Sequence, residues 1–332
     1  MVVAGAACTP GPTVPRATGT TTTTATGTPT TTASGSPTPT VVVRRSHTPG
    51  PCATAKAGAG DGGGSLIVFW SDSPFPSLWS MRPDGSGGRR VAPNDQNAKR
   101  PALSPDRRWI AFDGAPPGTP PLSQFHVQLV RADGTGRRTL AGHGFHTWEL
   151  DAQWSPDGRL VSFDRMPAGP DWRHSRVWTI RPDGTGARAI GRGTWARWSP
   201  DGKQLVVSAT TPNSDGDLFV MDADGTGRHR LLATPENEQP AAWSPDGKRI
   251  LFTRFGSDGA DVYVVDADGS NVRRLTRSRG DDVAATWSPD GSKILFTSDR
   301  TGLTQLYVMD PDGCFQRVLS PGRTNQFDPS WR

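Results

Sequence analysis

Paired aspartates in tight turns are the first residues of this chain that suggest chemistry, because neighbouring carboxylates can hold a calcium ion. They occur as Asp222-Ala-Asp224-Gly225, Asp266-Ala-Asp268-Gly269 and Asp310-Pro-Asp312-Gly313. An EF-hand loop needs a third oxygen ligand before its glycine and a distal glutamate, and these segments have neither. We therefore interpret the aspartates as turn formers that bond their own backbone, and we expect no cofactor.

Three histidines, His143, His146 and His174, are the candidate metal ligands, since His-x-x-His spacing can hold a transition metal. No acidic or amide partner can be placed beside them, so metal binding is the minor alternative. The chain also lacks the G-x-S-x-G, H-E-x-x-H and glycine-rich phosphate-loop motifs of hydrolases and nucleotide-binding enzymes. We expect a protein that is not an enzyme.

A repeat that runs through most of the chain positions these residues. The stretch from Trp243 to Thr276 returns 44 residues later as Trp287 to Ser320, with 16 of 34 positions identical. Each copy begins with a Ser-Pro-Asp-Gly turn, continues through short β-rich runs and includes an Asp-x-Asp-Gly turn. Four short strands in a period of this length are typical of one blade of a β-propeller.

The turns give the number of blades. The first turn occurs as SPD at 104–106, 155–157, 199–201, 244–246 and 288–290, and the second contains Asp-Gly at 84–85, 133–134, 183–184, 224–225, 268–269 and 312–313. The first unit lacks its leading strand, while the chain ends in an extra one with Trp331 in register. We therefore predict an all-β, six-bladed propeller over 66–332 with four-stranded blades, in which the C-terminal strand completes the first blade.

The repeated W-S-P-D-G and D-x-D-G segments resemble the TolB-type, WD-repeat-like β-propeller repeat over roughly residues 66–332. This family includes the periplasmic TolB protein, and its repeat is similar to the propellers that precede the hydrolase domain of prolyl-peptidase enzymes. The resemblance implies protein–protein recognition in the cell envelope. Two positions depart from the pattern: Leu103 replaces the tryptophan of the second blade, and Arg107 replaces its turn glycine.

Residues 1–65 differ from the propeller segment in composition. In the stretch 18–40, 13 of 23 residues are threonine, interleaved with proline, glycine and alanine, so we expect a disordered linker. Small residues precede Cys8, as in a bacterial lipoprotein signal truncated at its start. The hypothesis is an exported protein, periplasmic or extracellular, with a lipid anchor on Cys8. A chance cysteine is the alternative.

The other two cysteines are Cys52, in the linker that enters the first blade, and Cys314, just after a turn of the last blade. The first and last blades are neighbours in a closed ring. A disulfide between the two residues is therefore feasible in an exported protein. Two unpaired thiols are an equal alternative.

Charge and hydropathy argue against two classes of partner. The chain has 37 basic and 32 acidic residues, a formal net charge of +5, and part of this excess lies in residues 1–65. The propeller therefore has no basic excess suited to nucleic acid. No apolar run of about 18 residues occurs, so we expect membrane contact only through a lipid anchor.

The variable connections indicate where a partner would bind. The tight turns fall on one face of the ring, and the other face carries connections of varied length, such as 113–126 and 164–176. The residues entering the innermost strands there should surround the channel mouth: Arg100, Asp151, Trp195, Glu238, Asp282 and Gln326. We expect a polar funnel for a protein or peptide partner from the cell envelope. The alternatives are a glycan or cell-wall ligand, a metal-dependent lyase or hydrolase, and a solvated rim without a ligand.

Overall fold

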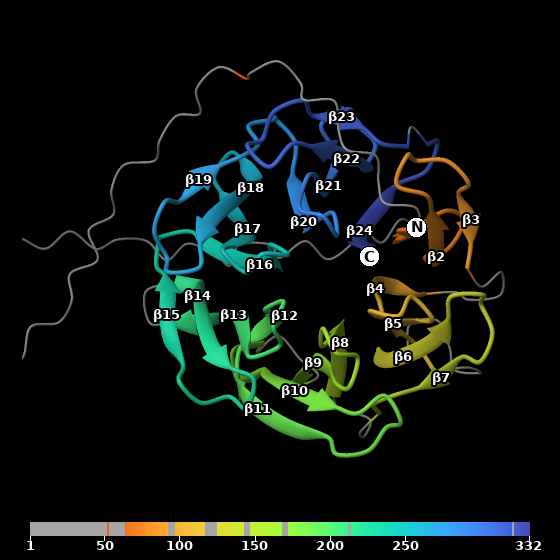
Figure 1. The fold of residues 1–332 in the computed structure, drawn as a ribbon, viewed down its shortest axis with the longest axis vertical. Helices are drawn as coiled ribbons and strands as arrows, with labels where there is room; N and C mark the ends of the chain where they lie inside the picture. The colour runs from red at the N-terminus through yellow and green to blue at the C-terminus, as the bar shows by residue number, and fades with distance from the viewer. Residues whose placement is uncertain are drawn as a thin grey trace, which may run out of the picture. The chain divides into compact units, whose positions relative to one another are not determined.

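Six four-stranded antiparallel sheets make up the described part of the chain, and they lie around a common centre (Figure 1). The computed structural model describes residues 52, 64–91, 97–116, 125–142, 147–167, 172–211, 214–320 and 322–332, which all belong to one compact unit, 44–332. Cys8, His143 and His146 lie outside the described residues. The predicted all-β, six-bladed propeller is confirmed.

Each blade runs from an innermost strand at the centre of the ring to a short outermost strand. In this order, blade 1 consists of β24 (Gln326–Trp331), β1 (Ile67–Ser71), β2 (Ser77–Met81) and β3 (Arg89–Arg90). Blade 2 consists of β4 (Lys99–Leu103), β5 (Trp109–Gly114), β6 (His126–Arg131) and β7 (Arg138–Thr139). Blade 3 consists of β8 (Thr147–Trp154), β9 (Val161–Pro167), β10 (Arg176–Ile180) and β11 (Arg188–Arg192).

The second half of the ring follows the same order. Blade 4 consists of β12 (Thr194–Trp198), β13 (Gln204–Thr211), β14 (Ser214–Asp222) and β15 (His229–Leu232). Blade 5 consists of β16 (Asn237–Trp243), β17 (Arg249–Gly256), β18 (Gly259–Asp266) and β19 (Arg273–Arg274). Blade 6 consists of β20 (Asp282–Trp287), β21 (Ile294–Ser298), β22 (Gln305–Met309) and β23 (Arg317–Val318). The short 3-10 helix η1 (Trp172–His174) precedes β10, and no helix in the described ranges is long and apolar enough to cross a membrane.

The Ser-Pro-Asp-Gly turn uses its polar side chains to close itself. In blade 5, Ser244 donates its hydroxyl hydrogen to Asp246 at 2.5 Å, and its oxygen accepts the amide of Arg249 at 2.9 Å. Gly247 has a φ of 71°, a conformation that costs glycine little. At the same position of blade 2, Arg107 has a φ of 59°, so the turn keeps its backbone conformation without glycine.

The aspartates of the Asp-x-Asp-Gly turn also accept hydrogen bonds from the backbone of their own turn. Asp268 accepts the amide of Ser270 at 2.9 Å, and Gly269 has a φ of 84°. A β-carbon at Gly269 would lie 2.5 Å from the carbonyl oxygen of Leu231 in blade 4, so the turn packs directly on the neighbouring blade. Among the described residues, no group of three or more acidic, histidine or cysteine side chains has the geometry of a metal site.

The hydrophobic core lies between the faces of adjacent blades. Trp154 at the end of β8 is buried in a cluster that contains Leu129 of blade 2, and its indole nitrogen donates to the carbonyl oxygen of Ala102 at 3.1 Å. Trp243 makes the equivalent bond to the carbonyl oxygen of Arg197 in blade 4, also at 3.1 Å. The tryptophan that precedes each of these turns thus ties one blade to the blade before it.

Ring closure depends on β24, which pairs with β1 as the innermost strand of blade 1. Ile67 pairs with Trp331, and the backbones of Leu66 and Arg332 exchange hydrogen bonds of 2.6 and 3.1 Å just beyond the strands. The predicted closure by the C-terminal strand is therefore confirmed. It gives β1 two paired neighbours, as an inner strand of a four-stranded blade requires.

A disulfide joins Cys52 to Cys314, whose α-carbons are 5.7 Å apart. Cys314 is buried in the connection between β22 and β23. The bond therefore links the segment that precedes β1 to blade 6. The chain therefore has two connections between its beginning and its end: the disulfide from Cys52 to blade 6, and the pairing of β1 with β24.

Candidate binding site at the channel mouth

Every innermost strand carries a one-residue bulge, which changes the direction of its side chains. In β20, Val283 pairs with Thr297 and Thr286 pairs with Leu295, so the inner strand has one residue more. Equivalent register shifts occur in β4, β8, β12, β16 and β24. In five blades one residue of the bulge has a positive φ: Arg100 (48°), Asp151 (56°), Trp195 (59°), Ala284 (53°) and Asp328 (45°).

The six residues predicted to surround the channel mouth therefore fall on two levels. Arg100, Asp151 and Trp195 are the bulge residues of blades 2, 3 and 4. Glu238, Asp282 and Gln326 lie at the beginning of their strands, two positions before the bulge position. The structure brings the first three together in one cluster, and it places the others in their own blades.

The bulge residues of blades 2 to 4 meet at the centre of the ring. The guanidinium of Arg100 lies 5.3 Å from the ring centroid of Trp195, although blades 2 and 4 are not neighbours. Asp151 accepts hydrogen bonds of 2.5 and 3.1 Å from Arg197 of β12, and Arg197 also donates to the carbonyl oxygen of Ala241 at 2.9 Å. We call Arg100, Asp151, Trp195 and Arg197 the channel cluster.

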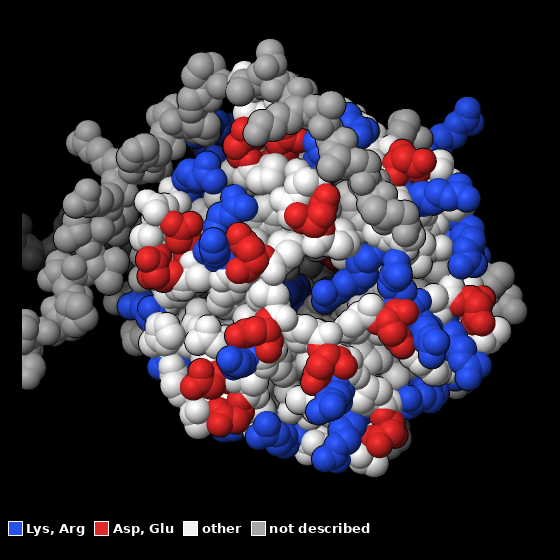
Figure 2. All heavy atoms as spheres, in the orientation of Figure 1, with Lys and Arg blue, Asp and Glu red and all other residues white. Residues whose placement is uncertain are grey.

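The channel cluster combines a half-buried indole with two guanidinium groups and one carboxylate. Viewed along the ring axis, Figure 2 shows a hollow at the centre of the propeller with basic side chains along one side of it. Aromatic rings and arginines are enriched among the residues that dominate protein–protein binding energy. The cluster therefore has the chemistry of a binding surface for a polar partner with some apolar area.

Two fully buried aspartates hold the bulges in place. Asp113 of β5 accepts the amide of Asp151 at 2.8 Å and the guanidinium of Arg100 at 2.6 Å. Asp164 of β9 accepts the amide of Trp195 at 2.7 Å. Each carboxylate thus holds the positive-φ bulge residue of the following blade, Asp151 or Trp195, by its backbone amide. Because both carboxyl groups are covered, they position the channel cluster and do not contact a ligand.

Burial raises the pKa of these two carboxyl groups. It raises the pKa of Asp113 from 3.8 to about 7, although the ion pair with Arg100 acts in the opposite direction. Burial and the neighbouring carboxylate of Asp151 also raise the pKa of Asp164 well above 3.8. The second oxygen of Asp164 has no hydrogen-bond partner among the described residues, so only its other oxygen is stabilised by a hydrogen bond, from the amide of Trp195.

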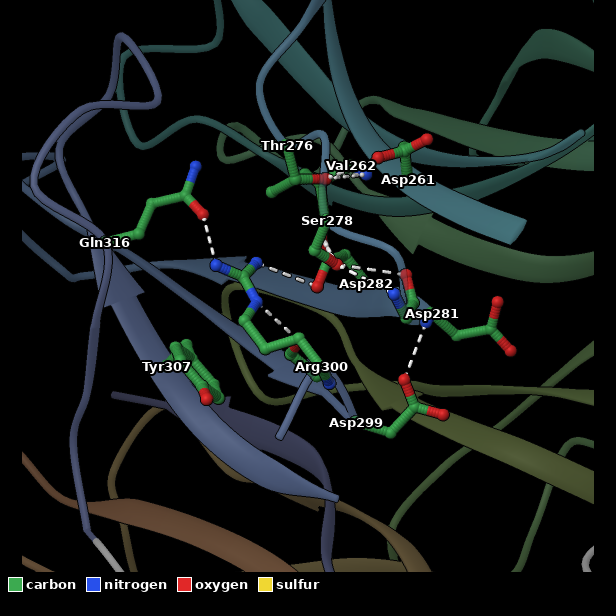
Figure 3. Close-up of polar contacts among 12 residues, drawn as sticks. Asp261, Val262, Thr276, Ser278, Asp281, Asp282, Asp299, Arg300, Tyr307 and Gln316 are labelled. Carbon is green, nitrogen blue, oxygen red and sulfur yellow. Dashed lines mark hydrogen bonds and ion pairs between the residues drawn. The ribbon is translucent and has the colours of Figure 1, made fainter. Parts of the chain in front are cut away.

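The outer level of the mouth is built from buried ion pairs. Asp282 is fully buried and accepts hydrogen bonds from Arg300 at 2.9 Å and from Ser278 at 3.0 Å (Figure 3). Arg300 also donates to Gln316 at 2.7 Å, and its guanidinium lies 4.7 Å from the ring centroid of Tyr307. An acid, an arginine and an aromatic ring are therefore layered from the inner strand outward.

Blades 3 and 5 repeat this arrangement as Glu149–Arg165–Trp178 and Glu238–Arg254–Tyr263. Both glutamates are fully covered, so Glu238 and Asp282 shape the mouth without presenting free charge to a ligand. Sequence reasoning missed the arginines. A signal was present, because Arg165 and Arg254 each follow the tryptophan of their blade by 11 residues.

The buried acids predict an unusual pH dependence of stability. Burial raises the pKa of Asp113 and Glu238 to about 7, from 3.8 and 4.5. The folded protein then holds protons that the unfolded chain releases between about pH 4 and 7, so the free energy of unfolding falls as pH rises through this window. At about 1.4 kcal/mol per pKa unit, each group contributes roughly 3–4 kcal/mol to this loss. Urea unfolding at pH 5 and pH 8 measures it.

The Glu238→Gln variant is expected to show a smaller loss of stability between pH 5 and pH 8 than the wild type. Asp268→Asn is the matched control, because the exposed turn carboxylate of Asp268 has a pKa lowered by its bonds to Ser270 and titrates below this window. Parallel pH profiles for the wild type and Glu238→Gln would contradict the assignment.

Of the three histidines predicted as candidate metal ligands, only His174 is among the described residues. His174 lies at the end of η1 and is exposed. A fourth histidine, His126, is buried at 3.3 Å from Glu149. These positions give no support to a metal centre within the described ranges.

A cavity of about 370 Å³ lies between blades 3 and 4 on the face of the tight turns. Its lining includes Asp157 and Asp201, whose carboxylates already accept hydrogen bonds from Ser155 at 2.6 Å and Ser199 at 2.7 Å. The cavity is the gap between two repeated turns. Its acidic groups are used to close those turns, so we place the candidate site at the channel mouth.

The sheets and the channel together define a six-bladed β-propeller with a charged and aromatic centre. Residues 242–332 match the family model described as the TolB beta propeller domain (PD40). The repeats of this chain are therefore similar to those of the TolB β-propeller. The same repeat extends over all six blades of the described ring.

Two curated relatives carry the TolB name. The protein TolB homolog of Chlorobium luteolum is 32% identical over 173 residues, which cover 50% of this chain and 36% of that protein. The Tol-Pal system protein TolB of Anaeromyxobacter dehalogenans is 36% identical, with 35% of this chain and 37% of that protein covered. The crystal structure of TolB from Acinetobacter baumannii has the same fold, with a TM-score of 0.68 at 19% identity over 82% of this chain and 67% of that one.

The chain spans only a part of its curated relatives. It covers 17% of a Bacillus subtilis protein named an uncharacterized peptidase, to which it is 28% identical over 109 residues. For the two TolB relatives the covered share is 36% and 37%. The likeness therefore concerns the repeats and not the whole of any of these proteins.

Proposed function

We propose that this chain is an exported, non-enzymatic binding protein that recognises a protein or peptide partner of the cell envelope. The partner is taken up at the channel mouth and the variable-connection face of the propeller. The observation that carries this proposal is the channel cluster, in which Arg100 lies over the half-buried indole of Trp195. The relatives named as TolB, one of them a Tol-Pal system protein, support an envelope partner.

Export is supported by the cysteines and by the composition of the N-terminal region. Disulfides persist in oxidising compartments, and Cys52 and Cys314 form one. The threonine-rich stretch 18–40 suits a spacer between a membrane and the propeller. We propose that residues 1–65 serve as this linker and that a lipid on Cys8 anchors the protein.

Substitution of the channel indole tests the binding site. The full chain and its Trp195→Asn variant are immobilised, and the proteins retained from an envelope extract are quantified by mass spectrometry. Asparagine tolerates the positive φ of 59° at this position, so the fold is kept. Removal of an aromatic anchor is expected to weaken retention of the partner by at least about tenfold.

Phe315→Asn provides the matched control. Phe315 is also an aromatic residue with a positive φ, 56°, and it is exposed beside the second turn of blade 6, away from the channel cluster. It should leave retention unchanged. Equal retention by the wild type and Trp195→Asn would refute the site, and a wild type that retains no protein would count against a protein partner.

A glycan is the second candidate ligand, because the indole of Trp195 is half-buried at the channel and flanked by hydrogen-bond donors of Arg100. An aromatic face with polar neighbours suits stacking against a sugar ring. A glycan array probed with the wild type and Trp195→Asn separates the two candidates. Binding to defined glycans that is lost in the variant would favour this reading over a protein partner.

A further inference from the structure

A second pocket, with a different chemistry, opens between blades 3 and 4. It has a volume of about 70 Å³. Its lining comes from η1 and the residue after it, from the end of β11 to the start of β12, from β13, and from one residue before β15. Its polar and charged lining includes Arg173, Ser175, Arg192, Thr194 and Arg228. None of these residues belongs to the channel cluster.

The charged side chains among the described lining of this pocket are those of Arg173, Arg192 and Arg228. No acidic residue is among its described lining. Within the described ranges, neither Arg192 nor Arg228 has a carboxylate within ion-pair distance. Arg192 and Arg228 line the same pocket, and partial burial together with the charge of Arg192 lowers the pKa of Arg228.

Arg228 is held in position by its neighbour in β14. Its guanidinium lies 4.2 Å from the ring centroid of Phe219, a distance at which a cation is attracted to an aromatic face. This contact leaves the hydrogen-bond donors at the edge of the guanidinium available. A stacked, pre-oriented arginine is suited to bidentate recognition of an oxyanion.

Ser175 supplies an independent indication of a ligand. It is 2% exposed, and its hydroxyl oxygen has no hydrogen-bond partner among the described residues. Its carbonyl oxygen accepts the amide of Gly193, which also lines the pocket. A buried hydroxyl without a partner is costly, and a ligand oxygen in the pocket would satisfy it.

We propose that this pocket binds a phosphate group, held by Arg192 and Arg228 and by the hydroxyl of Ser175. Several guanidinium groups around one small pocket, with no acidic residue in its described lining, favour a doubly charged oxyanion over a single carboxylate. The group is either free phosphate or the phosphate of a monoester. The two sources share the same recognition chemistry.

Calorimetric titration of the full chain tests the proposal, with inorganic phosphate as the probe and sodium acetate as the singly charged comparison. Ionic strength is held constant near the physiological value of about 0.15 M, because exposed charges are screened by salt. We expect one saturable phosphate site per chain and at least tenfold weaker binding of acetate. We also expect at least a tenfold loss of phosphate affinity in Arg192→Gln/Arg228→Gln.

Two further variants separate the site from general charge and from folding. Arg279→Gln/Arg323→Gln removes two exposed arginines from other connections and should keep phosphate affinity within twofold. Ser175→Ala removes only the unpartnered hydroxyl, so it should keep the melting temperature and lose several-fold in affinity. No saturable phosphate binding, or equal losses in the two arginine double variants, would overturn the proposal.

A parallel titration with glycerol 3-phosphate identifies the source of the phosphate. Tighter binding than inorganic phosphate would assign the pocket to a monoester, and weaker binding would assign it to the free ion. Either result supports the pocket. Failure of the channel variant Trp195→Asn to alter partner retention has no bearing on it, because the titration involves no protein partner.

Discussion

Deletion of residues 326–332 is expected to abolish cooperative folding of the propeller. This removes β24, the innermost strand of blade 1, and leaves one edge of β1 unpaired. It also removes Trp331 and Phe327 from two core clusters, and the loss of a large aromatic from a core costs about 3–5 kcal/mol. The sum approaches the whole stability of a typical domain, about 5–15 kcal/mol. Urea unfolding followed by circular dichroism measures the effect.

A deletion of residues 1–43 is the comparison, since none of these residues belongs to the described strands. Its melting temperature should equal that of the full chain. A synthetic peptide of residues 322–332 should restore a cooperative transition to the C-terminal deletion, because it supplies the missing strand in trans. A deletion variant that melts like the wild type would show that ring closure does not depend on β24.

The Arg300→Ala variant is expected to lose about 3–5 kcal/mol of unfolding free energy, because removal of one partner leaves a buried charge uncompensated. Asp282 is fully buried and would retain only Ser278 as a side-chain hydrogen-bond donor among the described residues. The stacking of Arg300 on Tyr307 would be lost as well. Chemical unfolding of the purified variant at pH 7 gives the value.

A double-mutant cycle distinguishes charge from packing. If the loss in Arg300→Ala comes from the uncompensated charge of Asp282, the double variant Asp282→Ala/Arg300→Ala should be more stable than Arg300→Ala alone, with Asp282→Ala completing the cycle. Arg279→Ala removes an exposed arginine from the neighbouring connection and should change stability by less than about 0.5 kcal/mol. Additive losses in the cycle would reject the coupling between Asp282 and Arg300.

The fold was predictable from the sequence because the turn sequences, the short β-rich runs and the repeat spacing all indicated the same blade. The Ser-Pro-Asp-Gly turns carry their own hydrogen bonds, as Ser244 and Asp246 show, so local sequence determines them. The spacing of Trp331 from Trp287 placed the last strand in register with the others, and the structure has it there. Recurrence in register left few arrangements other than a closed ring.

The candidate site was predictable only in part, because a bulge changes the direction of the side chains that follow it. Arg100 and Trp195 lie on the bulge and reach the centre, whereas Glu238 lies two positions before it and is covered by Arg254. The hydrogen bond from the amide of Trp195 to Asp164 joins two blades, so it cannot be predicted from the sequence around either residue. Pro240 lies at the bulge of blade 5 and has no amide hydrogen to donate. The bulge of blade 5 is therefore harder to recognise from the sequence as the equivalent of the other bulges.

The disulfide between Cys52 and Cys314 determines how tension along the chain enters the ring. A pulling force applied before residue 52 divides at this bond. One path leads along the chain into β1, and the other leads directly into the connection between β22 and β23 of the adjacent blade. With the bond reduced, the force enters the ring through β1 alone. Only the hydrogen bonds of β1 to β24 and β2 then hold that strand in its sheet. With the bond intact, the load reaches two blades, so reduction of this one bond is expected to lower the force that the ring withstands.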